Sequence, residues 1–250
     1  MSPLHAVAIF AAGAVAGTIN TVVGSGTLVT FPVLLGLGYA PVVANVSNTV
    51  GLVPGSAAGA IGYRRELSGQ RRRAVPLVVA SLLGGVIGAV LLLVLPASAF
   101  KAIVPAFIAV AVALIVLAPR LSRVLGVRGA TRRERAGPLT ILGVFTSGVY
   151  GGYFGAAQGI LLLAILGLTV DDDLQRINAL KVVLAGLVNF VSGVIFICVA
   201  HVAWLPALLI AAGSILGAIF GAAQGRRLPP GALRGLIVVV GVVAIVRLVA

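Results

Sequence analysis

The sequence predicts an all-α, polytopic transmembrane protein made of two inverted-topology repeats, and three observations support this fold class. The chain of 250 residues is 60% hydrophobic and only 9% charged, with a mean hydropathy of +1.21. A soluble domain could not cover its surface with so few polar residues. Two apolar segments with glycine-rich breaks stand at matching positions in the two halves, and the arginines gather between apolar runs.

The internal repeat is visible at a constant offset of 131 residues. The segment that begins at Gly17 reads G-T-I-N-T-V-V-G-S-G-T-L-V-T-F-P, and the one that begins at Gly148 reads G-V-Y-G-G-Y-F-G-A-A-Q-G-I-L-L-L. The paired positions are Gly17 with Gly148, Gly24 with Gly155, Gly36 with Gly167 and, with two residues inserted, Asn45 with Asn178 and Ser56 with Asn189. A glycine-broken segment ahead of an asparagine-bearing segment, present twice, is typical of transporters built from repeats.

Six apolar stretches have the length of roughly 20 residues that a helix needs to cross the hydrocarbon core. They cover residues 42–63, 75–95, 99–118, 177–200, 202–223 and 231–249. Segments 4–39 and 138–168 are too long for one span, because at about 1.5 Å per residue they reach roughly 45 to 55 Å. Each contains a break, at Gly24-Ser25-Gly26 and at Gly155-Ala156-Ala157-Gln158-Gly159. We therefore expect two half-helices joined inside the membrane, a re-entrant hairpin, whose irregular backbone is buried in protein or lines a wet cavity.

The basic residues predict the orientation. Basic loops at 64–73 and 119–137 are separated by two spans, so both can be cytoplasmic. If the broken segments return to their starting side, Arg176, Arg226, Arg227 and Arg234 also lie inside, and only Lys101 and Arg247 lie outside. Each repeat (1–125 and 126–250) of the single membrane domain 1–250 then has one hairpin and three spans. That number is odd, so the repeats are inverted and both termini are extracytoplasmic. A single kinked crossing would instead place those four arginines outside.

These motifs resemble the TauE/SafE sulfite exporter family, also called the toluene-sulfonate uptake permease family. In the first half a glycine-rich break is followed by Pro32 and by A-x-x-x-N, from Ala44 to Asn48; in the second, G-V-Y-G-G-Y-F-G-A-A-Q-G leads to Asn178 and Asn189. The resemblance covers essentially the whole chain. It implies a small permease of a bacterial or archaeal inner membrane for sulfur-containing or carboxylate anions, such as sulfite, sulfonates and sulfoacetate. Ser25, Thr27, Ala156, Ala157 and Gln158 depart from the family's run of glycines, which bears on the solute more than on the fold.

The breaks supply the first candidate site residues. A half-helix that begins at a break offers unpaired N–H groups and the positive end of its dipole to an anion. Glycine lets the backbone approach the solute. The candidates are the break glycines Gly24, Gly26, Gly155 and Gly159, the donors Ser25, Thr27 and Gln158, and the flanking Asn20 and Tyr150. Glycines that only let helices pack closely are the alternative, and we favour it for Gly84, Gly85 and Gly88.

Polar residues of the following spans supply the rest. They are Asn48 and Ser56 in one span, and Asn178, Lys181 and Asn189 in the other. An amide within a membrane needs a partner, which is either the solute or another helix. We interpret Asn45 as a helix cap. Lys181 is the one cation inside a span; it either holds an anionic group or reaches back to the cytoplasmic surface.

Several function classes are excluded. The acidic residues Glu66, Glu134, Asp171, Asp172 and Asp173 all fall in predicted loops, so an intramembrane carboxylate relay is absent. No metal-ligand cluster, nucleotide-binding loop or catalytic constellation is visible. We therefore expect no cofactor, no metal site and no enzyme activity. The net charge of +13 comes from arginines between apolar runs, which we interpret as topology determinants rather than as a nucleic-acid surface.

The sequence thus predicts a secondary transporter of small anions with alternating access around a site between the two hairpins. An anion that leaves a negative interior gains roughly 2.3 kcal/mol per charge per 100 mV, so export needs no proton carrier. A passive channel on the same scaffold and an uptake permease for carboxylates or other organic anions are the alternatives. The expected partners are the solute and the bilayer. Direction, coupling ion and a homo-oligomeric state stay open.

Overall fold

The computed structural model describes residues 1–125, 136–170, 172–224 and Val239, and across these residues all regular structure is helical. The elements are α1 (Pro3–Val22), α2 (Thr27–Gly36), α3 (Pro41–Gly62), α4 (Arg64–Leu67), α5 (Arg71–Val94), α6 (Ala97–Leu125), α7 (Pro138–Tyr153), α8 (Gln158–Thr169), α9 (Leu174–Val199) and α10 (Trp204–Gln224). The predicted span 231–249 and most of the basic loop 119–137 lie outside the described residues, as do Arg226, Arg227, Arg234 and Arg247.

Five predicted spans correspond to helices α3, α5, α6, α9 and α10. Helices α1, α5, α9 and α10 are both long and apolar enough to cross a membrane. Helix α3, with 22 residues, is also long enough to cross a membrane. It is less apolar than these four helices because it carries a row of buried polar side chains. Helix α5 begins at Arg71, ahead of the apolar run, because Arg73 is buried there and donates to Gln70. The multi-pass helical fold is therefore confirmed.

Both long segments break where the sequence predicts, at Gly24 and Gly155. The backbone turns there through φ angles of 92° and 74°, in the left-handed region that favours glycine. The N–H of Gly24 donates to the Ile19 carbonyl at 2.8 Å, and the N–H of Gly155 donates to the Tyr150 carbonyl at 3.1 Å. The two breaks thus share one hydrogen-bonding pattern at the repeat offset.

The arms of the two hairpins are unequal, and this corrects the expectation of paired half-helices. Helix α1 has 20 residues and α2 has 10, while α7 has 16 and α8 has 12. The first arm of each hairpin is the longer one because the apolar run before the break is longer than the apolar run after it. Only α2 and α8 have the length of half a span.

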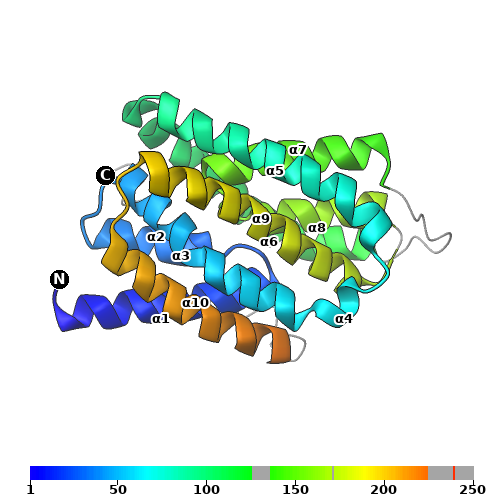
Figure 1. Ribbon diagram of the computed structural model, residues 1–250, viewed down its shortest axis with the longest axis horizontal. Helices are drawn as coiled ribbons and strands as arrows, with labels where there is room; N and C mark the ends of the chain where they lie inside the picture. The colour runs from blue at the N-terminus through cyan, green and yellow to red at the C-terminus, as the bar shows by residue number, and fades with distance from the viewer. Residues whose placement is uncertain (126–135, 171, 225–238, 240–250) are drawn as a thin grey trace.

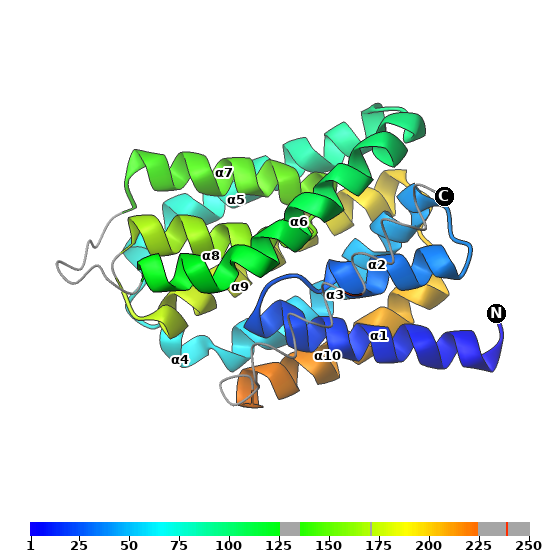
Figure 2. The ribbon, with the colours of Figure 1, turned by 180° about the vertical axis from the view of Figure 1, so that it is seen from behind.

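Equivalent helices of the two halves run in opposite directions. In Figure 1 the chain runs along α1 and α3 away from the end where the N-terminus lies, and along α7 and α9 toward that end. Figure 2 shows the same arrangement from behind. Helix α1 packs along α10, α7 packs along α5, and α3 crosses α9. Each half therefore lays its first helix against the third long helix of the other, which supports an exchange of elements about a two-fold axis.

Glycines bring these helix pairs into backbone contact. A Cβ on Gly17 of α1 would lie 2.2 Å from the Ser214 carbonyl oxygen of α10, and a Cβ on Gly88 of α5 would lie 2.1 Å from the Val149 carbonyl oxygen of α7. A Cβ on Gly84 would lie 2.3 Å from the Phe145 carbonyl oxygen of α7, and one on Gly85 would lie 2.9 Å from the Val191 side chain of α9. The packing interpretation of Gly84, Gly85 and Gly88 is confirmed, since a side chain at any of them would push the helices apart.

Candidate functional site at the helix breaks

The two breaks touch one another through their backbones. The N–H of Gly159 donates to the carbonyl oxygen of Gly24 at 2.9 Å. A Cβ on Gly24 would lie 2.5 Å from the Cα of Gly159. The start of α8 therefore meets the turn between α1 and α2, and only glycine at both positions permits this approach.

The end of each first arm is closed by an asparagine from the other repeat. Asn178 Nδ2 on α9 donates to the Thr21 carbonyl of α1 at 3.3 Å, and Asn45 Nδ2 on α3 donates to the Tyr153 carbonyl of α7 at 3.0 Å. The last carbonyls of a helix have no N–H donor within the helix, so donors from outside satisfy them. The interpretation of Asn45 as a cap of its own helix is wrong, because Ala40 is the N-cap of α3. Its partner lies 108 residues away, beyond what local spacing reveals.

Lys181 lies at the same place and is fully buried. Its Nζ donates to the Asn20 carbonyl at 3.0 Å and to the Thr21 carbonyl at 3.3 Å. Its stem packs against Gly24 and Gly159. The alternative in which Lys181 reaches the cytoplasmic surface is therefore wrong. The ammonium faces the negative end of the α1 dipole, and two of its three donors are used.

Polar atoms without a protein partner gather around these contacts. Among the described residues they include Ser25 Oγ, Gln158 Nε2, Asn45 Oδ1, Asn178 Oδ1, Ser147 Oγ and Tyr153 Oη, all buried. Four belong to residues at the breaks or to the asparagines that close them, and Ser147 and Tyr153 lie on the arm that leads to the second break. Buried polar groups in proteins are nearly always paired, with protein, water or ligand. The breaks thus hold hydrogen-bonding capacity that the chain itself does not use.

A second polar cluster joins α2 to α3. Asn48 Nδ2 donates to Thr27 Oγ1 at 3.3 Å, and the Thr30 hydroxyl donates to Asn48 Oδ1. Thr30 was absent from the predicted site, although its spacing of three from Thr27 places both on one face of α2. Once the two inserted residues are counted, the repeat aligns Asn48 with Lys181. Equivalent positions in the two halves therefore carry a neutral amide and a cation.

Comparison with known proteins bears on what these breaks do. The model of the family "Sulfite exporter TauE/SafE" matches residues 9–248. The chain belongs to this family. It is 28% identical to a probable membrane transporter protein, ORF9, of a Sinorhizobium species, covering 97% of this chain and 91% of the relative. It is 26% identical to the probable membrane transporter protein YfcA of Escherichia coli K12, with 99% and 91% covered. No solved structure matched significantly. Membership makes this chain a multi-pass membrane transporter rather than an enzyme.

The structure places the other predicted site residues of this TauE/SafE protein less uniformly. Asn20 contributes its backbone carbonyl to the site rather than its amide. Ser56 donates to Leu52 of its own helix at 2.9 Å, and with Asn20 it lines a cavity of about 10 Å³. A cavity of that size holds at most one water molecule. Asn189 is half-buried, and no hydrogen bond within the described residues joins it to the breaks.

The remaining candidates shape the breaks themselves. The Tyr150 hydroxyl donates to the Ala156 carbonyl and so closes the turn between α7 and α8. A Cβ on Gly26 would lie 2.5 Å from the Ala16 carbonyl oxygen, so this glycine packs against α1. Phe31, Phe100, Phe154 and Tyr153 meet edge-on or tilted beside the second break, with ring centroids of Phe31 and Phe154 5.1 Å apart. Sequence reasoning missed this aromatic cluster, because its members come from three separate helices.

Proposed function

We propose that this TauE/SafE transporter is a secondary exporter of small anions, with sulfite, sulfonates and sulfoacetate as first candidates, and that it works by alternating access around the two breaks. The observation that carries the proposal is Lys181. It is a fully buried cation with no ion pair to a carboxylate among the described residues. An ionisable residue inside a membrane bundle marks a functional site, and a negatively charged solute supplies the missing counter-charge.

The backbone around Lys181 supports an anion. Helices α2 and α8 begin at the breaks, and the positive ends of their dipoles suit negative oxygens. The expectation of unpaired N–H groups is corrected here, because those of Leu28, Gln158 and Gly159 donate to backbone carbonyls. The opposite, negative ends of α1 and α7 are occupied by Lys181, Asn178 and Asn45. Unpartnered donors on Ser25 and Gln158 remain available beside them.

Two features support alternating access over a channel. The cavity beside Asn20 has room for about one water, and the larger one at Ser56, of about 200 Å³, lies between α3 and α9 and is lined by no residue of the breaks. The breaks themselves are in direct backbone contact. A solute the size of sulfite therefore requires the halves to move. Equivalent helices run in opposite directions, which supports such a motion. In transporters with inverted repeats, each repeat can adopt the conformation of the other, and the site then opens to the opposite side of the membrane.

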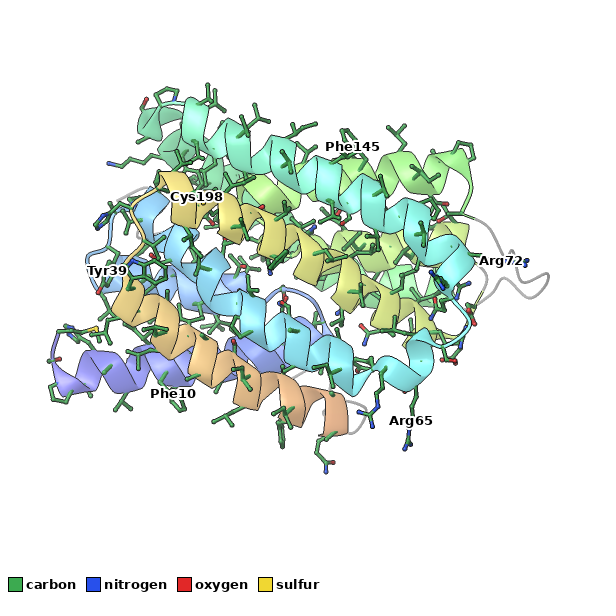
Figure 3. All side chains as sticks on the ribbon, viewed as in Figure 1. Phe10, Tyr39, Arg65, Arg72, Phe145 and Cys198 are labelled. Atoms are coloured by element: carbon green, nitrogen blue, oxygen red, sulfur yellow. The ribbon has the colours of Figure 1, made fainter. Side chains whose placement is uncertain are left out.

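The charge distribution supports the orientation and the direction of transport. Figure 3 shows Arg65 and Arg72 at one end of the molecule and Tyr39 and Cys198 at the other. We place the arginine end in the cytoplasm of a bacterial or archaeal inner membrane, with the N-terminus outside. No described carboxylate lies inside a span to carry a proton. Export down the membrane potential needs none, whereas concentrative uptake of an organic anion, the alternative, needs a coupled cation to drive it.

Proteoliposomes test the proposal. Purified protein is reconstituted with labelled sulfite or methanesulfonate inside, and an inside-negative potential is imposed. We expect faster efflux, saturation with concentration and acceleration by unlabelled anion on the opposite side. Flux that stays linear with concentration indicates the channel alternative. The proposal is rejected if the efflux of every small anion tested is the same with and without the protein and does not change with the potential.

A further inference from the structure

The fixed charge at the breaks amounts to one positive unit. Lys181 is the cation there, and its equivalent in the first repeat is the neutral Asn48. Arg73 and Arg176 lie at the loop end of the bundle, where both pair with Asp172. No other charged side chain of the described residues contacts the breaks. The dipole ends do not change this count to first order. Each break joins the negative end of one helix to the positive end of the next, and their partial charges are of equal size.

We propose that the site selects anions that carry a single negative charge, such as a sulfonate or hydrogen sulfite, and rejects dianions such as sulfate. The inference rests on the proposed function and narrows its substrate class: it keeps sulfonates with one acid group and hydrogen sulfite, and it excludes the sulfite dianion and sulfoacetate, which carries a carboxylate beside its sulfonate. A monoanion beside the Lys181 ammonium forms a neutral pair. A dianion leaves one negative charge uncompensated in a buried environment, where unpaired charge is strongly disfavoured.

The neutral groups around Lys181 act in the same direction. Ser25 and Gln158 are 1% and 3% exposed, and their unpartnered donor groups suit the oxygens of an oxyanion without adding charge. Asn45 Oδ1 and Asn178 Oδ1 are unpartnered acceptors. These two oxygens repel a second negative oxygen, and they accept a hydrogen bond from a protonated one, as hydrogen sulfite carries. Donors and acceptors together fit an anion whose charge is not spread over every oxygen.

The internal repeat indicates where a second positive charge can be added to test this selectivity. Asn48 stands where Lys181 stands in the other half, held by Thr27 and Thr30 of the half-helix α2. A cation introduced at this position gives the two halves equal charge. Asn48→Lys is therefore expected to admit dianions, whereas Lys181→Gln leaves the site with no net charge and weakens all anions.

The experiment compares two tetrahedral oxyanions of similar size, methanesulfonate with one charge and sulfate with two, as competitors of labelled methanesulfonate in proteoliposomes. In the unaltered protein, sulfate should need at least about tenfold more concentration for half-inhibition, a ratio that corresponds to about 1.4 kcal/mol. Asn48→Lys should lower this ratio, and Lys181→Gln should weaken methanesulfonate by about tenfold or more. Lys101→Gln removes the other lysine, at the exposed start of α6, and should change neither.

The possible results separate the two proposals. Sulfate that competes as well as methanesulfonate overturns the charge selectivity and leaves anion transport standing. Loss of competition and transport by both anions overturns the two together. Where Asn48→Lys does not yield monodisperse protein, charge moved per labelled solute is measured in the unaltered protein. One charge per methanesulfonate with no sulfate current supports the inference, and a sulfate current of two charges per ion overturns it.

Discussion

At Gly24 the backbone has a φ angle of 92° and lies against Gly159 with no room for a side chain. Gly24→Ala should cost about 1–3 kcal/mol, since it combines a strained left-handed residue with overpacking. We expect a lower midpoint of thermal unfolding in detergent and loss of transport. Gly36→Ala is the matched control, because no atom lies within 4 Å of its Cβ position. An unchanged midpoint in Gly24→Ala would show that the breaks are not in contact.

Asn45 and Asn178 perform the same task for opposite repeats, but only the carbonyl bound by Asn178 has a second donor. Asn45→Ala leaves the buried Tyr153 carbonyl without its side-chain donor, at a cost of about 1–3 kcal/mol. Asn178→Ala leaves the Thr21 carbonyl bonded to the Lys181 ammonium and should cost less. Thermal unfolding of both variants checks this, with Ser56→Ala as control, because its hydroxyl bonds only within α3. A larger loss in Asn178→Ala than in Asn45→Ala would contradict this assignment of donors.

Some features of the site could be predicted from the sequence, and others could not. The breaks at Gly24 and Gly155 were predictable, because glycine among apolar residues has a local conformational meaning. The partners of Asn45 and Lys181 were not, since they lie 108 and 161 residues away. A polar residue in an apolar run signals that it has a partner, but only the packing of helices shows which one.

Among the elements, the pairs α1–α10 and α5–α7 depend on small residues at their contact. Gly88→Ala places a Cβ about 2.1 Å from the Val149 carbonyl oxygen, and backbone cannot rotate aside as a side chain can. We expect α5 and α7 to separate, with a clear fall in the unfolding midpoint. Gly193→Ala on α9 is the control, because the nearest atom to its Cβ position is 3.4 Å away. Equal midpoints would mean that these helices adjust freely.

The connection between α8 and α9 is tied to α5 by a buried ion-pair cluster. Burial raises the pKa of Asp172, but hydrogen bonds from Arg73 and Arg176 outweigh it and lower the pKa from 3.8 to about 2. The cluster is also held by Gln70, which accepts from Arg73 and donates to the Arg176 carbonyl at 3.0 Å. It thus joins the first half of the chain to the second at the arginine end.

The lowered pKa of Asp172 fixes the sign of a pH effect. Its stabilisation, about 2 kcal/mol, is complete above the unfolded pKa near 3.8 and is lost as the pH falls toward 2. Asp172→Asn should lower the unfolding midpoint at neutral pH and flatten its decline between pH 4 and 2. Asp173→Asn should have little effect, because asparagine also caps a helix and residue 173 caps α9. An acid profile unchanged by Asp172→Asn would exclude this cluster as its source.

Across the whole molecule, the number of breaks and the placement of five spans were predictable, because both depend on local hydropathy and glycine. The length of each hairpin arm was not predictable. Helix α1 continues to Val22 because it packs against α10, and the hydrogen bond between them, from Thr18 to the Gly217 carbonyl, joins residues 199 positions apart. The contact that closes the site also depends on packing between the two halves, which cannot be predicted from any single segment of the sequence.

The orientation in the membrane is open to a direct test by cysteine labelling. Ser68 follows α4 at the arginine end, His201 follows α9 at the opposite end, and both are exposed. In a Cys198→Ser background, which removes the chain's one cysteine, His201→Cys should react with a membrane-impermeant maleimide in intact cells. Ser68→Cys should react only after permeabilisation. The reason is the arginine loop beside Ser68, since basic residues stay in the cytoplasm. The reverse pattern would place the N-terminus inside and would overturn the orientation proposed here, while the direction of transport, which follows the membrane potential, would stand.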